Sequence, residues 1–258
     1  MDVPQKNIIP AVEVRDLAIG YGDRVVLEKL NFAINPGEVV CIMGGSGCGK
    51  STLLKHIIGL YQPLQGDIFI RGESMVNAAG EQKKALMRSL GVTYQGGALF
   101  GWMSVAENVE FPLREYTELT AAERRERVQE KLALVGLEKF GSFMPGELSG
   151  GMCKRAGLAR ALALEPDLLF FDEPSAGLDP LSSAGLDRLI LDLRERTGAT
   201  IVVVTHELDS VFTIGDRALM LDRERRTLVA DGKPAELIKT YAGSWVGDFL
   251  SRNGTANR

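Results

Sequence analysis

The residues GGSGCGKS at positions 44–51 constrain the fold of this chain more than any other stretch. The apolar segment EVVCIMG (38–44) runs straight into them, and STLLKHIIGL (51–60), which has helical spacing, follows. A strand, a glycine-rich loop and a helix in this order form a P-loop, whose glycines let backbone N–H groups wrap around phosphates. Lys50 would reach the β- and γ-phosphates, and the Ser51 hydroxyl would ligate Mg²⁺. We therefore predict that a nucleotide is bound by Gly44, Gly45, Ser46, Gly47, Cys48, Gly49, Lys50, Ser51 and Thr52.

A second glycine-rich segment, LSGGM (148–152), opens what looks like another helix. Such an opening suits an anion, because free backbone N–H groups and the positive end of the helix dipole point at it. Ser149, Gly150 and Gly151 are thus a second candidate phosphate cradle, with no lysine at the position that matches Lys50. The sequence therefore raises the question of why one chain carries two cradles of different charge.

Asp172 and Glu173 end the apolar segment DLLFFDE (167–173). Ligands of open α/β sheets bind at the carboxyl ends of the strands, which is where these two carboxylates are expected. Asp172 suits Mg²⁺, and Glu173 lies one residue further, where it could polarise a water for attack on the γ-phosphate. Two carboxylates at a strand end are weak evidence alone, but an upstream P-loop makes them a strong signal.

The chain has two histidines, and one of them closes a second apolar strand. His206 follows IVVVT (201–205) at the same ligand-facing edge, so we expect it to contact the γ-phosphate. His56 lies inside the helix after the P-loop, and we interpret it as structural.

Alternating patterns predict a mixed architecture for the rest of the chain. Strands are expected at 11–19, 25–34 and 66–70, with tight turns at 21–24 and 35–38. A helix is expected from Thr120, which forms a capping box with Glu123, to a stop near Gly136; Val128, Leu132 and Val135 share one face. The arginines at 124, 125 and 127 are interpreted as a solvated face.

The apolar pattern in the last third of the sequence predicts a parallel sheet. Buried-type strands at 167–173 and 199–207 flank a helix at 182–198, and 208–221 gives another helix and strand. Strand–helix–strand order with continuous apolar strands implies a parallel sheet covered on both faces. No internal repeat or linker suggests a second independent domain.

Composition narrows the functional classes. The formal net charge of −4 argues against general nucleic-acid binding, which needs a basic surface. Cys41, Cys48 and Cys153 form no CxxC pair and are interpreted as reduced thiols of a cytosolic protein, packed as small hydrophobes. We see no targeting segment and no apolar run near the ~20 residues that span a bilayer. Work at a membrane would therefore depend on a partner.

The set of motifs resembles the nucleotide-binding subunit of ABC transporters, over residues 11 to about 240. LSGGM is similar to that family's LSGGQ signature, and its position between a P-loop and a D-E strand is highly specific. The resemblance implies that two subunits pack head to tail, so that Ser149, Gly150 and Gly151 would cap the γ-phosphate held by Lys50 of the other subunit. The missing lysine is then explained, because the second cradle completes the site and can release it after hydrolysis.

The resemblance also implies roles for further residues. Tyr21 matches the aromatic residue that stacks on adenine, and Asp179, in SAGLDP (175–180), lies in the loop that crosses the dimer interface. Gln95 matches the glutamine that touches Mg²⁺ and relays the nucleotide state to the membrane subunit. Met152 departs from the usual glutamine, but catalysis is expected to persist because the serine and glycines are intact. The implied cofactors are ATP and Mg²⁺, the catalytic residues are Glu173, His206, Lys50 and Gln95, and the metal ligands are Ser51, Gln95 and Asp172.

The fold implied is α/β, with a P-loop NTPase (RecA-like) core of mostly parallel sheet, an N-terminal antiparallel β subdomain and an inserted α-helical subdomain. We predict one ABC ATPase domain at 1–250, with the core at about 1–92 and 166–240 and the helical subdomain at about 93–165. Residues 241–258 would be a C-terminal helix or tail, and the sequence leaves open whether this stretch stabilises a dimer.

Three short motifs indicate one particular type of ABC ATPase. QGGALF (95–100), FPLRE (111–115) and LSGGM together look like the ATPase of Mce/Mla-type phospholipid transporters of Gram-negative envelopes. The implied partners are a second copy of the chain, an integral membrane permease, an Mce-domain lipid-binding protein and a small cytosolic accessory subunit, with no nucleic acid. The implied location is cytoplasmic, peripheral on the cytoplasmic face of the inner membrane.

Three alternatives are considered. An importer ATPase for amino acids or another small solute would have the same chemistry, because other proteins choose the cargo. A soluble ABC ATPase of DNA repair, chromosome structure or translation would need a long coiled coil or a duplicated cassette; no heptad run occurs, and the chain has one cassette. A non-catalytic nucleotide-binding module is disfavoured by the intact Lys50, Asp172, Glu173 and His206.

Overall fold

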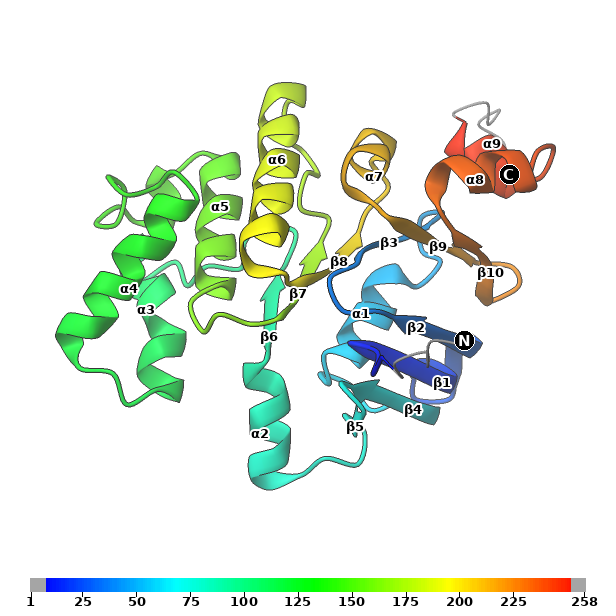
Figure 1. Ribbon diagram of the computed structural model, residues 1–258, viewed down its shortest axis with the longest axis horizontal. Coiled ribbons are helices and arrows are strands. Elements are labelled where there is room, and N and C mark those ends of the chain that lie inside the picture. The colour runs from blue at the N-terminus through cyan, green and yellow to red at the C-terminus, as the bar shows by residue number, and fades with distance from the viewer. Residues whose placement is uncertain (1–7, 252–258) are drawn as a thin grey trace, which may run out of the picture.

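A computed structural model describes residues 8–251, in which two sheets and a set of helices pack together (Figure 1). The smaller sheet is antiparallel, with the strand order β2-β1-β4-β5. Val12 of the first strand pairs with Ile34 on one side and Ile70 on the other. The expected antiparallel N-terminal strands are therefore confirmed, as β1 (Val12–Tyr21), β2 (Arg24–Ile34) and β4 (Gln65–Ile70). The short β5 (Glu73–Ser74) joins them and was not predicted.

The larger sheet has the order β10-β9-β3-β8-β7-β6, and all its neighbouring strands except the β10/β9 pair are parallel. Every residue of its three central strands is buried, as continuous apolar runs predict. The α/β class with a mostly parallel sheet is confirmed. The strands are β3 (Val39–Gly44), β6 (Leu90–Thr93), β7 (Leu168–Asp172), β8 (Thr200–Val204), β9 (Arg217–Asp222) and β10 (Thr227–Gly232).

Alternate residues of β3 belong to two different hydrophobic cores. Val40 and Ile42 pack with the antiparallel sheet and with α1 (Lys50–Ile57), the helix after the P-loop. Val39, Cys41 and Met43 pack with the helices on the other face. The central sheet is thus covered on both faces, which fixes the P-loop at its edge.

Three helices lie at the end of the molecule away from the antiparallel sheet (Figure 1). They are α3 (Val105–Tyr116), α4 (Ala121–Leu134) and α5 (Gly150–Ala161), and α5 follows a short 3-10 turn, η1 (Pro145–Glu147). The other helices are α2 (Gly80–Arg88), α6 (Pro180–Thr197), α7 (Leu208–Ile214), α8 (Pro234–Thr240) and α9 (Trp245–Leu250). The division into subdomains at 93 and 165 stays a prediction.

Helix α4 follows its sequence pattern closely. Thr120 and Glu123 form the expected capping box, and the face carrying Val128 and Leu132 is buried. The interpretation of its arginines as a solvated face is wrong for two of them. Arg124 Nε lies 2.8 Å from Glu110 Oε1 in a half-buried ion pair, and the half-buried Arg127 pairs through Nη1, at 2.5 Å, with the exposed Glu165.

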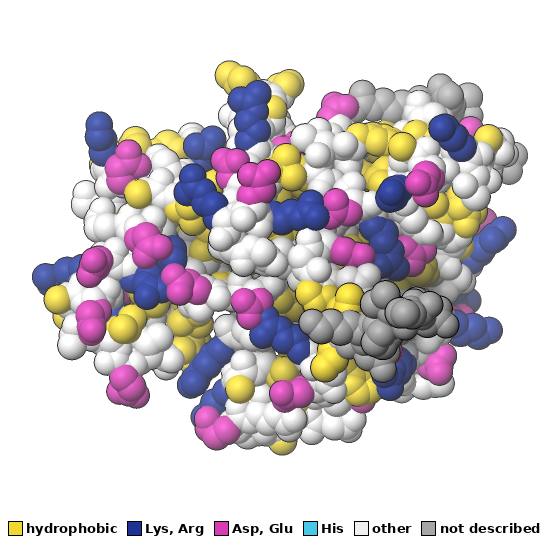
Figure 2. Space-filling model, viewed as in Figure 1, with side chains coloured by type: hydrophobic (Ala, Val, Ile, Leu, Met, Phe, Trp, Pro, Cys, Tyr) yellow, Lys and Arg dark blue, Asp and Glu magenta, His cyan; other side chains and the backbone are white. Residues whose placement is uncertain are grey.

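The C-terminal stretch forms the short helix α9 as far as it is described, and the frayed tail expected beyond it lies outside the described residues. Between residues 8 and 251, no helix has the length and apolar character needed to span a bilayer. On the face shown in Figure 2, Lys and Arg side chains are mixed with Asp and Glu side chains rather than gathered into one basic area.

Candidate nucleotide-binding site

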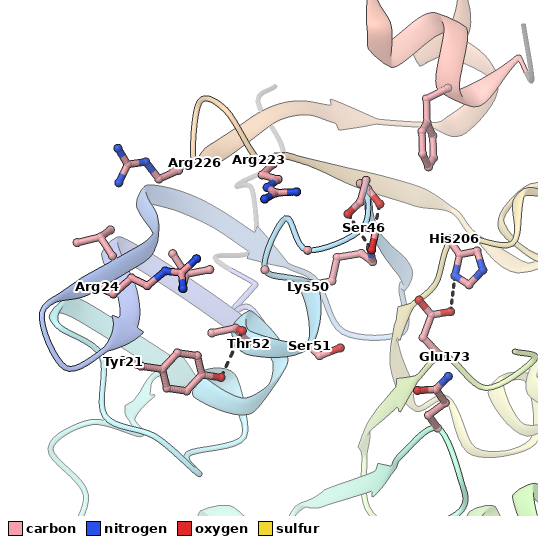
Figure 3. A pocket seen from close by; sticks show the side chains of 18 residues that line it. Tyr21, Arg24, Ser46, Lys50, Ser51, Thr52, Glu173, His206, Arg223 and Arg226 are labelled. Carbon is pink, nitrogen blue, oxygen red and sulfur yellow. Dashed lines mark hydrogen bonds and ion pairs between the residues drawn. The ribbon is translucent and has the colours of Figure 1, made fainter. Parts of the chain in front are cut away.

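A cavity of about 870 Å³ opens above the P-loop (Figure 3). It brings together residues that are far apart in the sequence but follow strand ends of the two sheets. The predicted site residues that line it are Tyr21, Gly44, Gly45, Ser46, Gly47, Gly49, Lys50, Ser51, Thr52, Gln95, Glu173 and His206.

The glycines of the P-loop are required by their surroundings. Gly44 has φ 145°, and a Cβ there would lie 2.4 Å from the Leu221 carbonyl oxygen. Gly49 has φ 106° and is the N-cap of α1, and a Cβ there would lie 2.8 Å from Val26 Cγ1. A Cβ on Gly45 would meet no atom within 4 Å, so the loop leaves open space where a phosphate would bind.

Cys48 differs from its neighbours in the loop. Its side chain is buried among the residues that pack against α1, so it forms part of the core and no wall of the cavity. Burial raises the pKa of the Cys48 thiol, and it raises the pKa of the Cys41 thiol to about 12. Both cysteines therefore behave as small hydrophobes, as the sequence suggested, whereas Cys153 is half-buried.

Two polar side chains of the P-loop make contacts within the chain. Lys50 Nζ donates to the carbonyl oxygens of Gly44 (2.9 Å) and Gly45 (3.2 Å). Ser51 Oγ donates to Asp172 Oδ1 at 3.0 Å. The pKa of the Asp172 carboxyl is raised, mainly because the group is buried. The hydrogen bond from Ser51 acts in the opposite direction, while the nearby charge of Glu173 raises the pKa further.

The serine and the aspartate fit a Mg²⁺ site that nucleotide phosphates would complete. Mg²⁺ prefers oxygen ligands and is held in such sites by one or two carboxylates together with the phosphates. Here Ser51 lines the cavity, and the buried Asp172, which does not line it, holds a carboxylate oxygen 3.0 Å from the Ser51 hydroxyl. Between residues 8 and 251, no group of three or more His, Cys, Asp or Glu side chains could hold a metal.

Glu173 and His206 meet at the ends of neighbouring strands. The Glu173 backbone has φ 51° and its N–H donates to the Val204 carbonyl oxygen at 2.8 Å. Its Oε2 lies 2.8 Å from His206 Nδ1, and His206 Nε2 lies 3.6 Å from Glu207 Oε1. Figure 3 shows the carboxylate and the imidazole side by side at one wall of the cavity. The arrangement can orient a water from two sides.

Tyr21 places an aromatic ring at the cavity wall, beside α1. The ring of Tyr21 is half-exposed to the cavity, and its hydroxyl lies 3.4 Å from Thr52 Oγ1. Tyr21 and Tyr61 pack edge to face with 5.5 Å between ring centroids. His56 is buried beside them with Nδ1 2.8 Å from the Thr52 carbonyl oxygen, which agrees with its structural interpretation.

The second glycine cradle, at 149–151, opens onto a different cavity. Ser149 caps α5 and accepts a hydrogen bond from the Met152 N–H at 3.2 Å. Ser149, Gly151 and Met152 line a separate cavity of about 240 Å³, together with Leu178 of the 175–180 loop. Within one chain, the two glycine cradles therefore face different cavities.

Asp179 acts within its own chain in the structure. It caps α6, accepting from the N–H groups of Leu181 and Ser182 at 3.1 and 3.0 Å. The Ser182 hydroxyl donates to its other oxygen at 2.5 Å. Its predicted role at a dimer interface stays a prediction.

Sequence reasoning missed part of the cavity wall. Val25 and Val26 add apolar surface near Tyr21, and Phe249 of α9 reaches the cavity from the C-terminal end. Three arginines, Arg24, Arg223 and Arg226, also line it. A usable signal was present for the last two, because RERR (223–226) directly follows a strand that belongs to the same parallel sheet as the P-loop.

Comparisons with known proteins agree with this geometry. A family model described as ABC transporter matches residues 27–176. The probable ribonucleotide transport ATP-binding protein mkl of Mycobacterium tuberculosis is 42% identical over 241 residues, which are 93% of this chain and 66% of that protein. The intermembrane phospholipid transport system ATP-binding protein MlaF of Escherichia coli K12 is 39% identical over 246 residues, which are 95% of this chain and 90% of that protein. This chain therefore spans just under two thirds of the length of the mkl relative.

A solved structure gives the same fold. It is a dimeric ATP-binding cassette in a post-hydrolysis state, bound to ADP and Pi. The TM-score is 0.78 and the identity 31%, with 86% of this chain and 98% of that chain covered.

Proposed function

The chain belongs to the ABC transporter family, and from that membership we propose that it is the ATP-hydrolysing subunit of a phospholipid transporter. It would act as a head-to-tail dimer on an integral membrane permease. One observation carries the catalytic part of this proposal. The P-loop, the Ser51–Asp172 pair and the Glu173–His206 pair converge on one cavity, while the signature residues line another.

Each part of the cavity has a distinct task in this proposal. The P-loop amides and Lys50 hold the phosphates, which requires Lys50 to leave the Gly44 and Gly45 carbonyl oxygens for the ligand. Ser51 and Asp172, with Gln95, would hold Mg²⁺, which neutralises phosphate charge when bound. Glu173 accepts a proton from the attacking water, and His206 holds the carboxylate in place and reaches the γ-phosphate side.

The second cradle explains the need for a dimer. Ser149, Gly150 and Gly151 would close over the γ-phosphate in the partner's P-loop, with hydroxyl, amides and helix dipole but without a full charge. A cradle of that kind binds the triphosphate and releases it once the γ-phosphate is gone. ATP binding would therefore close the dimer, and hydrolysis would open it.

The phospholipid cargo is supported by the motifs QGGALF and FPLRE and by the similarity to the MlaF phospholipid transport proteins, of which this chain covers 86–90%. The 42% identity to mkl proteins favours a second candidate, a small solute such as a ribonucleotide. The further proposed partners are an Mce-domain lipid-binding protein and a small accessory subunit. The proposed location is the cytoplasmic face of the inner membrane.

A pull-down followed by a transport assay tests the proposal. The tagged chain is purified from detergent-solubilised membrane, the bound proteins are identified, and the complex is placed in vesicles loaded with labelled phospholipid or with labelled ribonucleotide. We expect a permease and an Mce-domain protein in the complex, and ATP-dependent movement of the phospholipid that a complex with Lys50→Ala does not show. ATP-dependent movement of the ribonucleotide alone would replace the first candidate with the second. A purified complex that hydrolyses no ATP would contradict both.

A further inference from the structure

Three arginines from two turns line the nucleotide cavity outside the P-loop and the other predicted site motifs. Arg24 begins β2, while Arg223 and Arg226 lie in the turn between β9 and β10. We propose that Arg223, assisted by Arg24, is a further phosphate-binding residue, which holds the nucleotide from the side of the P-loop opposite α1. This inference rests on the proposed function, because it assigns a residue to the same nucleotide.

Strand register places Arg223 beside the P-loop. Strands β9 and β3 are parallel neighbours, and Leu221 pairs with Gly44, the first glycine of the loop. The chain that leaves β9 therefore emerges at the same sheet edge as the P-loop, two residues before Arg223. A Cβ on Gly47 would lie 4.0 Å from Arg223 Nη1, and that is the nearest atom it would meet. The guanidinium therefore lies directly over the open part of the loop.

The turn that carries Arg223 is held in a fixed shape. The buried Asp222 accepts hydrogen bonds at its Oδ1 from the N–H groups of Glu224 (2.7 Å) and Arg225 (2.8 Å). The carbonyl oxygen of Arg226 accepts from the Glu28 N–H at 2.8 Å, which ties the turn to β2. A fixed turn lowers the entropy cost of placing its side chain on a ligand.

The three arginines point in different directions. In Figure 3 the guanidinium of Arg223 is directed toward the P-loop, whereas that of Arg226 is directed away from it. Arg24 lies on the side of the cavity where Tyr21 and Thr52 are. Arg223 is thus the one that can reach the phosphates over Gly47, and Arg24 can act nearer the ribose end.

The cavity lining carries more positive than negative charge. It contains the permanent cations Arg24, Lys50, Arg223 and Arg226, and Glu173 is its carboxylate. Across residues 8–251, the side chains of Arg24 and Arg223 take part in no ion pair or hydrogen bond, whereas Arg217 on the same strand β9 is paired with Asp231. A guanidinium without a carboxylate, set over a glycine loop, matches the geometry and charge of a phosphate chain.

Nucleotide titration of three variants tests the proposal. Binding of ATP and ADP is measured by calorimetry for the wild-type chain, Arg223→Ala, Arg223→Lys and Arg225→Ala, at low and at high salt. Arg225 is a matched control, because it lies in the same turn and is exposed but does not line the cavity. We expect Arg223→Ala to weaken both nucleotides by roughly three- to tenfold, between the values for an exposed ion pair and for a buried charged hydrogen bond. The loss should shrink at high salt, Arg223→Lys should recover part of the affinity, and Arg225→Ala should match the wild type.

The outcomes separate this inference from the proposed function. Arg223 is exposed, so Arg223→Ala should unfold at the wild-type temperature, and its affinity can be compared directly. If the wild type binds ATP and Arg223→Ala binds it equally well, the role of Arg223 is wrong and the proposed function stands. An equal loss in Arg225→Ala would reduce the effect to general surface charge and also overturn the inference. A wild type that binds no ATP would overturn both.

Discussion

Glu173 has a backbone conformation that glutamate seldom adopts. Its φ of 51° lies in the left-handed region, which costs energy for a residue with a Cβ and is found most often at functional sites. The conformation turns the side chain toward His206, whose Nδ1 lies 2.8 Å from Glu173 Oε2. We therefore expect the backbone conformation of Glu173 to help orient its carboxylate.

Glu173→Gln should leave nucleotide binding intact and remove the base. Glutamine has nearly the same shape, but its amide cannot take a proton from water, so hydrolysis should fall by roughly 10²–10⁴-fold. The ATP-bound dimer should then accumulate, which size-exclusion chromatography with ATP detects alongside a phosphate-release assay. Glu195→Gln, on the exposed side of α6, is the control and should hydrolyse ATP at the wild-type rate. Wild-type turnover by Glu173→Gln would show that another group is the base.

Residues set by local motifs could be predicted from the sequence, and residues set by register could not. Lys50, Ser51 and Glu173 each follow a recognisable strand or loop, so their place in the cavity was expected. Arg223 enters the site because β9 pairs with β3. The position of RERR (223–226) after a strand placed it at a strand end, but only the pairing of β9 with β3 puts that strand end beside the P-loop. Asp179 caps α6 in the structure, and its predicted place at a dimer interface stays a prediction.

At the scale of elements, α5 and the loop after Gln95 touch backbone to backbone. A Cβ on Gly157 would lie 2.7 Å from the Gly97 carbonyl oxygen and 2.9 Å from its Cα. Arg160 of the same helix donates to the carbonyl oxygens of Gly97 (3.0 Å) and Ala98 (2.7 Å). The helix that begins at the signature is thereby joined to the loop that carries a predicted Mg²⁺ ligand.

Gly157→Ala should destabilise the protein, although alanine normally favours a helix. The new methyl group would press on backbone that cannot move aside, and such overpacking costs about 1–3 kcal/mol of unfolding free energy. For a chain of this size we expect a fall in Tm of roughly 2–10 °C, measured by circular dichroism.

Gly185→Ala in α6 is the matched control. Its Cβ would lie 3.3 Å from Arg155 Nη2, the end of a flexible side chain, so the gain in helix propensity of about 1 kcal/mol should dominate. Its Tm should equal or exceed that of the wild type. If Gly157→Ala were as stable as Gly185→Ala, the close contact between α5 and the loop would not exist.

Elements with a strong apolar pattern were predicted well, and weakly buried ones were not. The wholly buried β3, β7 and β8 and the two-faced α4 match their patterns. Helix α2 buries only Leu86, and the edge strand β10 buries only Ala230, so neither has a periodic apolar face to detect. Helix α3 contains Pro112, which argues against a helix from sequence alone.

At the scale of the whole molecule, the two cradles are separate, and the proposed dimer would explain why the second has no lysine. The P-loop faces a cavity of about 870 Å³, and Ser149 and Gly151 face one of about 240 Å³. In the proposed head-to-tail dimer, a second molecule would complete the γ-phosphate site of a nucleotide held by Lys50. Each P-loop would then have one composite site.

A mixed dimer tests this arrangement. A Gly151→Asp subunit should still bind ATP in its own P-loop, because the new carboxylate lies at the other cavity; the Cβ at this position is 3.6 Å from Leu178 Cδ2, so the side chain has room. In a dimer, that carboxylate would meet the partner's γ-phosphate, and like charges at such range strongly oppose closure where water is excluded.

The homodimers of Gly151→Asp and of Lys50→Ala should both fail to hydrolyse ATP. When the two variants are combined, one composite site receives both defects and the other has a sound P-loop facing a sound signature. ATPase activity of the differentially tagged, purified heterodimer in its transporter complex should therefore exceed that of both homodimers. The decisive contrary result is a Gly151→Asp protein that cannot bind ATP when alone and dilute, because that would place the second cradle at the P-loop of its own chain.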